Sequence, residues 1–79
     1  MNDYDYTLNG WKFRVEINDR GSYDVFLWQP PNNYFTPYTD APKNVREWAL
    51  RIWKDITEGL SEECLIEANG YIVTTTRSK

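Results

Sequence analysis

The sequence predicts an α+β domain. A three-stranded antiparallel β-meander packs on one amphipathic helix, and a C-terminal β-hairpin, or a short helix plus a strand, follows. Three observations support this: two turn motifs at hairpin spacing, alternating apolar residues around them, and a later segment with helical apolar spacing. The 79 residues fit a single domain, 1–79, of which about 77–79 are expected to fray. Four Trp, six Tyr and three Phe supply large side chains for a core.

The first hairpin turns at Asn9-Gly10, a dipeptide that favours the two-residue type I′ turn. This turn sets the register of the first two strands and separates an apolar face from a polar face. The expected apolar pairs are Leu8 with Trp11, Tyr6 with Phe13 and Tyr4 with Val15, and the expected polar pairs are Thr7 with Lys12 and Asp5 with Arg14.

The second hairpin turns through a three-residue loop, Asp19, Arg20 and Gly21, in which the glycine takes the left-handed position of a bulge. A four-residue loop would place Val15 opposite Asp24 and mix the two faces. The three-residue loop keeps the apolar face that the first turn selects. Its expected pairs are Ile17 with Tyr23, Val15 with Val25 and Phe13 with Leu27.

A helix over about residues 42–58 is predicted to cover this apolar face, because its apolar residues recur at helical spacing. An Asn44-x-x-Glu47 pair predicts a capped start, and Gly59 predicts the end. Leu50 lies off the apolar stripe, beside the edge of Trp53, and the two form a candidate contact patch. The expected stripe contains Val45, Trp48, Ala49, Ile52, Trp53, Ile56 and Leu60.

The last segment allows two interpretations. Asn69-Gly70 fits the turn of a further, C-terminal hairpin, which pairs residues 64–68 with residues 71–75. Alternatively, Ser61 caps a short helix that carries acidic residues in its first turn and ends at Gly70. In both interpretations residues 71–75 form a strand.

Catalytic and metal-binding motifs are missing from the sequence. It contains no histidine, the commonest general base and transition-metal ligand. Cys64 has neither a second thiol nor an imidazole as partner, so we interpret it as a small, half-buried hydrophobe. Glu16 and Asp24 lie opposite each other in the predicted register and are expected to be solvated surface carboxylates. We therefore expect no enzyme activity, no cofactor and no metal.

Charge and hydropathy argue against two further classes. The net charge of −3 argues against a dedicated duplex-DNA binder, whose affinity depends on neutralising phosphates. The N-terminus lacks the basic and apolar regions of a secretory signal, and no apolar run is long enough to cross a bilayer. We expect a cytoplasmic protein that is a monomer or a homodimer and does not bind membranes.

Two surfaces are candidates for binding. Residues 29–42 contain all four prolines, and a loop stiffened by proline presents aromatic rings at low entropic cost. The alternative is that these rings fold back and close the end of the sheet and helix sandwich. The protein-binding candidates around this loop are Tyr34, Phe35, Tyr38, Trp28 and Leu50. On the polar face of the meander, basic residues beside rings suit the stacking of single-stranded RNA or DNA, and the candidates there are Lys12, Arg14, Phe26 and Trp28.

The run FRVEINDRGSYDVFLW, two alternating strands around a polar turn that precede a loop and a helix, resembles the N-terminal half of HicB-type antitoxins. The resemblance implies a hairpin and helix pattern and an antitoxin-like regulator, and it assigns no site residue. The extra N-terminal strand and the longer aromatic loop depart from that family. Small size, acidity and missing catalytic motifs are typical of small phage-encoded inhibitors, including anti-CRISPR proteins. We therefore expect a non-enzymatic module that regulates or inhibits a partner protein, with single-strand binding as the alternative.

Overall fold

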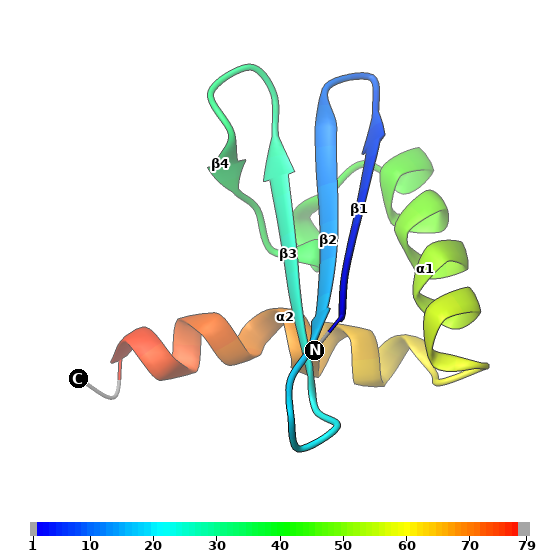
Figure 1. Cartoon of the computed structure of the whole chain (residues 1–79). Helices are drawn as coiled ribbons and strands as arrows, with labels where there is room; N and C mark the ends of the chain where they lie inside the picture. Colours follow the sequence, from blue (N-terminus) through cyan, green and yellow to red (C-terminus); the bar gives the residue numbers. More distant parts are fainter. Residues whose placement is uncertain (1, 78–79) are drawn as a thin grey trace.

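The computed structural model describes residues 2–77, and the side chains of residues 3–70. An antiparallel sheet with strand order β1-β2-β3-β4 lies on two helices (Figure 1). The expected α+β class is therefore confirmed. Along the chain, the elements are β1 Asn2–Leu8, β2 Trp11–Ile17, β3 Tyr23–Gln29, β4 Tyr34–Phe35, the 3₁₀ helix η1 Tyr38–Asp40, α1 Lys43–Thr57 and α2 Glu62–Arg77.

Both predicted hairpins, with their registers, are confirmed. Asn9 and Gly10 have φ angles of 49° and 88°, as a type I′ turn requires. In the second turn Gly21 has a φ of 82°, and its N–H donates to the carbonyl oxygen of Asn18 at 2.9 Å. The Asn18 side chain also accepts hydrogen bonds from two N–H groups of the turn, those of Arg20 and Ser22. The two turns thus fix the register of the strands, and the register determines which residues share the apolar face.

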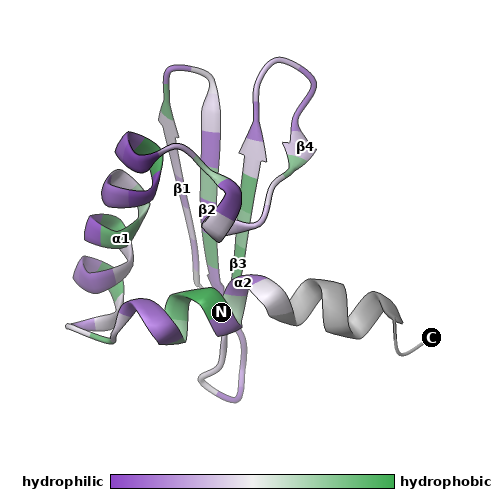
Figure 2. Ribbon diagram, turned by 180° about the vertical axis from the view of Figure 1, so that it is seen from behind, coloured by the Kyte–Doolittle hydropathy of each residue, from purple (hydrophilic) through white to green (hydrophobic). Residues whose placement is uncertain are grey.

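Both helices lie on the same side of the sheet (Figures 1 and 2). Helix α1 runs roughly along the strands, and α2 crosses them near the end that carries the β2–β3 turn. The buried hydrophobic residues come from the apolar face of the sheet, from the segment around η1, and from both helices. They are Phe13, Val15, Val25, Leu27, Tyr38, Ala41, Val45, Ala49, Trp53 and Leu65. Within residues 2–77, no helix lies on the other face of the sheet.

Helix α1 has nearly the predicted bounds, but its start differs from the prediction. Pro42 occupies the N-cap and no side chain caps the helix, so the predicted Asn44 and Glu47 capping pair is wrong. The helix begins at Lys43, which places Asn44 inside its first turn instead of at the N-cap. At the other end Glu58 takes the left-handed conformation with a φ of 62°, and Gly59 follows with a φ of 104°.

The C-terminal segment corrects the predicted tail. Residues 64–68 and 71–75 lie in one helix, α2, so the predicted C-terminal hairpin and the predicted final strand are both wrong. The alternative with a helix start at Ser61 was right in that respect: the Ser61 hydroxyl accepts a hydrogen bond from the Cys64 N–H at 3.3 Å. The helix continues through Gly70 to Arg77 instead of ending. Of the residues predicted to fray, 77–79, Arg77 is the last residue of α2, and 78–79 lie outside the described residues.

Asn69 explains why the predicted turn is absent. Its side chain is 3% exposed and faces the core from the middle of α2. Its Oδ1 accepts a hydrogen bond from the Tyr38 N–H at 2.8 Å, and its Nδ2 donates to the Val25 carbonyl oxygen at 3.2 Å. One amide therefore joins η1, the outer edge of β3 and α2. A hairpin at Asn69 would leave both of these buried backbone groups without this partner.

The loop of residues 29–42 is more regular than the prolines suggested. Tyr34 and Phe35 form the two-residue strand β4, which pairs with the end of β3. The next residue, Thr36, donates its N–H to the Leu27 carbonyl oxygen at 2.7 Å and its hydroxyl to Gln29 Oε1 at 2.9 Å. The chain then turns through η1 into the core, which brings it to the start of α1.

Tyr38 gives the fold an expected sensitivity to alkali. Its hydroxyl donates to Glu62 Oε2 at 2.8 Å, and burial, together with this bond to a carboxylate, raises the pKa of Tyr38 well above its usual value. The folded protein keeps the Tyr38 proton at a pH where the unfolded chain releases it. The contribution of Tyr38 to the free energy of unfolding is therefore fully present below about pH 10 and is lost as the pH rises further. We expect Tyr38→Phe to lose less stability between pH 8 and pH 11 than the wild type does, as measured by thermal melting. Tyr34→Phe, changed at a ring that is 63% exposed, should behave as the wild type, and an equal alkaline loss in all three proteins would contradict this assignment.

Candidate functional site: the open sheet face

The sheet face opposite the helices, which we call the open face, is organised in three rows of cross-strand neighbours. Residues directly opposite each other in an antiparallel pair point to the same side of the sheet. The register therefore sets the rows from the β1–β2 turn downwards. They are Thr7, Lys12, Trp28 and Phe35; then Asp5, Arg14 and Phe26; then Asp3, Glu16 and Asp24.

Aromatic rings gather at the β3 and β4 corner of the open face. Phe26 and Trp28 stack with ring centroids 5.4 Å apart and an interplanar angle of 19°. Phe35 lies opposite Trp28 in the register, because β4 pairs with β3 there. All three are half-buried, and no helix covers them. This corner, formed by Phe26, Trp28 and Phe35, is hereafter the aromatic corner.

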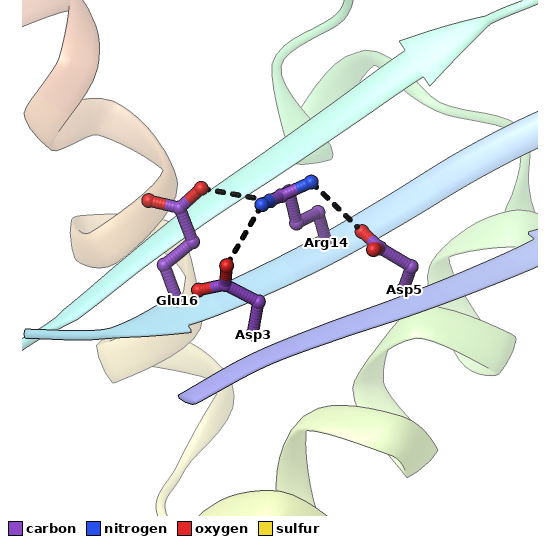
Figure 3. Close-up of polar contacts among 4 residues, drawn as sticks. All are labelled: Asp3, Asp5, Arg14 and Glu16. Carbon is purple, nitrogen blue, oxygen red and sulfur yellow. Dashed lines mark hydrogen bonds and ion pairs between the residues drawn. The ribbon is translucent and has the colours of Figure 1, made fainter. Parts of the chain in front are cut away.

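Arg14 lies at the centre of the open face and contacts three carboxylates (Figure 3). Its Nε is 2.7 Å from Glu16 Oε2, its Nη2 is 3.0 Å from Asp3 Oδ2, and its Nη1 is 3.3 Å from Asp5 Oδ1. The hydrogen bond to Glu16, with the charges of the neighbouring carboxylates, raises the pKa of Arg14 above its usual value. The guanidinium is therefore directed at side chains of the protein itself and joins β1 to β2.

The open face carries more acid than base. Four carboxylates, from Asp3, Asp5, Glu16 and Asp24, share it with Lys12 and Arg14. Asp24 and Lys12 have no ion pair among the described residues, whereas Arg14 has three. The acids concentrate in the third row, which we call the acidic row: Asp3, Glu16 and Asp24.

A shallow hollow of about 470 Å³ lies in the open face beside Trp28. Its lining includes Asp5, Thr7, Lys12, Arg14, Trp28 and Asn33. The hollow therefore adjoins both an aromatic ring and charged groups, as binding surfaces for polypeptides commonly do.

Of the predicted protein-binding residues, Tyr38 is buried in the core and Leu50 is partly buried against it, which corrects those two assignments. Tyr38 is 2% exposed, so its ring closes the sandwich and is not available to a partner. Leu50 packs against the core and Trp53 is 1% exposed, so the predicted Leu50 and Trp53 patch does not form. Trp28 and Phe35 are paired across β3 and β4 on the open face. Tyr34 is exposed and is paired with Gln29 instead, so it lies outside that row. Leu50 is apolar because its side chain packs against the core from one side of α1.

The nucleic-acid candidates do share one face, as predicted: Lys12, Arg14, Phe26 and Trp28 all lie on it. The sequence did not predict that Phe35 pairs with Trp28 through β4, because a two-residue strand after a proline-rich turn has no distinct sequence pattern. It also missed that Arg14 contacts Asp3 as well as its cross-strand neighbour.

Other chemistry has little support in the described part of the chain. Cys64 is a half-buried free thiol beside the Ser61 hydroxyl. No group of three His, Cys, Asp or Glu side chains among the described residues is placed to hold a metal ion. None of the helices described has the length and apolarity needed to cross a membrane.

Comparison with known proteins identifies no relative. A scan against protein-family models, a search of curated proteins and a search of solved structures each gave no match. The resemblance to HicB-type antitoxins therefore remains one of sequence pattern, and the function has to be argued from the open face.

Proposed function

We propose that the protein is a non-enzymatic binding module that regulates or inhibits a partner protein, which it contacts through the open face. The observation that carries the proposal is the aromatic corner. Phe26 and Trp28 stack on a face without a helix, and Phe35 lies opposite Trp28 in the register. Aromatic rings held in fixed positions are favoured anchors in protein interfaces, because little side-chain entropy is lost on binding.

The charge of the same face favours a protein over a single-stranded nucleic acid. Stacking platforms for nucleic acids combine rings with a positive groove that follows the phosphates. Here Arg14 is occupied by three carboxylates, and Lys12 is the other basic group on the face. Phosphates near the acidic row would be repelled. An inhibitor of the phage-encoded type and an antitoxin-like regulator both fit this proposal.

The test is a comparison of two alanine variants. A partner is captured with the wild-type protein from a lysate of its own cells, identified by mass spectrometry, purified and titrated by calorimetry. Trp28→Ala is expected to weaken binding by about 30-fold or more, the typical effect of losing a central anchor. Arg51→Ala, changed at an exposed position on α1, should bind as the wild type.

Circular dichroism and melting curves must show that both variants are folded. If Trp28→Ala is folded and binds the partner as tightly as the wild type, the open face is not the interface. Failure of the wild type to retain any protein under these conditions would contradict the proposal as a whole.

A further inference from the structure

We propose that the partner presents a short basic segment to the open face, with Lys or Arg side chains on the acidic row and an apolar side chain on the aromatic corner. This inference rests on the proposed function and specifies the chemistry of the partner. It follows from the placement of the acidic row and the aromatic corner at different positions on the open face.

The acidic row has carboxylate oxygens available for a partner. Arg14 donates hydrogen bonds to Asp3 Oδ2 and Glu16 Oε2, and among the described residues no hydrogen bond is donated to the second oxygen of either carboxylate. Asp24 has no ion pair at all among the described residues, and it lies directly opposite Glu16. Like charges opposite each other in a sheet destabilise it, so a cation placed between Glu16 and Asp24 relieves that repulsion.

The spacing of the two features sets the length of the segment. Asp24 and Trp28 lie on the same strand, four residues apart, and each residue of a strand adds about 3.4 Å. Asp24 and Trp28 are therefore about 14 Å apart, the span of some four residues of an extended peptide, and Phe26 lies between them on the same strand. A basic residue and an apolar residue at that separation would reach both features.

The charge pattern also disfavours the other occupants of such a face. A second copy of this chain would bring the same excess of carboxylates against the acidic row, and like charges across an interface reduce affinity. A nucleic acid would bring phosphates to the same place. A basic polypeptide segment gains from the charges and also from the aromatic rings, whose faces attract cations.

The experiment uses random twelve-residue peptides displayed on phage and selected on the immobilised full-length protein. Enriched peptides are synthesised and titrated against the wild type by following tryptophan fluorescence. We expect enrichment in Lys and Arg together with an apolar residue, and an affinity that falls as salt concentration rises.

Two charge-reversal variants with the same net charge provide the decisive comparison. Asp24→Lys changes the acidic row at a residue that has no ion pair among the described residues, and it places a cation opposite Glu16, so the fold should be kept. Asp55→Lys makes the same change at an exposed position on α1. Asp24→Lys should weaken binding of the selected peptides at least about tenfold, and Asp55→Lys by less than about twofold.

The outcomes distinguish this inference from the proposed function. If the selected peptides are neutral or acidic, or if both Lys variants weaken binding equally, the basic-segment inference is wrong. The proposed function survives that result provided that Trp28→Ala still weakens binding of the captured partner by about 30-fold or more. If no peptide is enriched, the basic-segment inference is wrong, and the Trp28→Ala titration against the captured partner decides the proposed function separately. If a single-stranded oligonucleotide binds the open face in preference to the captured partner, both proposals are wrong.

Discussion

Replacing Trp53 with alanine is expected to remove a large part of the protein's free energy of unfolding. The ring is 1% exposed, lies edge-on to Tyr23 at a centroid distance of 5.1 Å, and donates its indole N–H to the Ser61 carbonyl oxygen at 3.0 Å. Truncating a buried Trp to Ala typically costs about 3–5 kcal/mol. A domain of this size has about 4–12 kcal/mol of stability in total. Urea unfolding followed by circular dichroism should show the loss as a lower midpoint.

Two further variants show how much of this effect depends on burial. Trp48→Ala removes a ring that is only half-buried and contacts Phe13 at a centroid distance of 6.0 Å, so it should cost clearly less than Trp53→Ala. Trp53→Phe keeps most of the apolar volume and loses the hydrogen bond to Ser61, so it should fall between the wild type and Trp53→Ala. Equal midpoints for Trp48→Ala and Trp53→Ala would contradict the central position assigned to Trp53.

The first half of the fold is predictable from sequence because its determinants are local. Asn9, Gly10 and Gly21 adopt the positive φ angles that their turns need, and each turn determines a register within a few residues. The start of α2 is local in the same way, because the Ser61 hydroxyl caps its first turn. These elements need no information from distant parts of the chain.

The candidate site was only partly predictable, because it depends on contacts between distant segments. The register alone places Lys12, Arg14, Phe26 and Trp28 on one face, as the hairpins predicted. Whether the loop rings are buried depends on where the loop packs. Tyr38 is drawn into the core by hydrogen bonds to α2, which lies more than twenty residues further along the chain.

Asn69 is the clearest case of a local signal overruled by tertiary structure. Asn-Gly is a strong turn motif, yet the partners of the Asn69 side chain lie 31 and 44 residues away in the sequence. Leu65, four residues earlier, is fully buried on the same side of α2, whereas Ile66 is 38% exposed. This spacing follows a helix, and burial of the amide gives the helix its orientation on the sheet.

Replacing Asn69 with leucine is therefore expected to destabilise the protein by about 2–5 kcal/mol, although leucine is similar in size. The substitution leaves the Tyr38 N–H and the Val25 carbonyl buried without their partner, and each such group costs about 1–3 kcal/mol. Urea unfolding measures the total, and hydrogen exchange of the Tyr38 amide reports the local effect. Ile66→Ala, at a partly exposed position on the same helix, is the control and should cost much less.

Asn69→Asp separates the two hydrogen bonds, since it keeps the acceptor for the Tyr38 N–H and replaces the donor to Val25 with an oxygen. The new carboxyl group, when protonated, can still donate to the Val25 carbonyl, whereas the ionised carboxylate repels it and is buried in the core. Burial favours the neutral form, so the folded state holds the proton more tightly than the unfolded chain does. The stability of this variant relative to the wild type should thus be highest at acidic pH and fall as the pH rises towards neutral.

If Asn69→Leu instead matches the wild type in stability and Asn69→Asp shows no such pH dependence, the amide does not hold α2, η1 and the edge of β3 together. The orientation of the helix would then depend on Leu65 and the other apolar contacts alone.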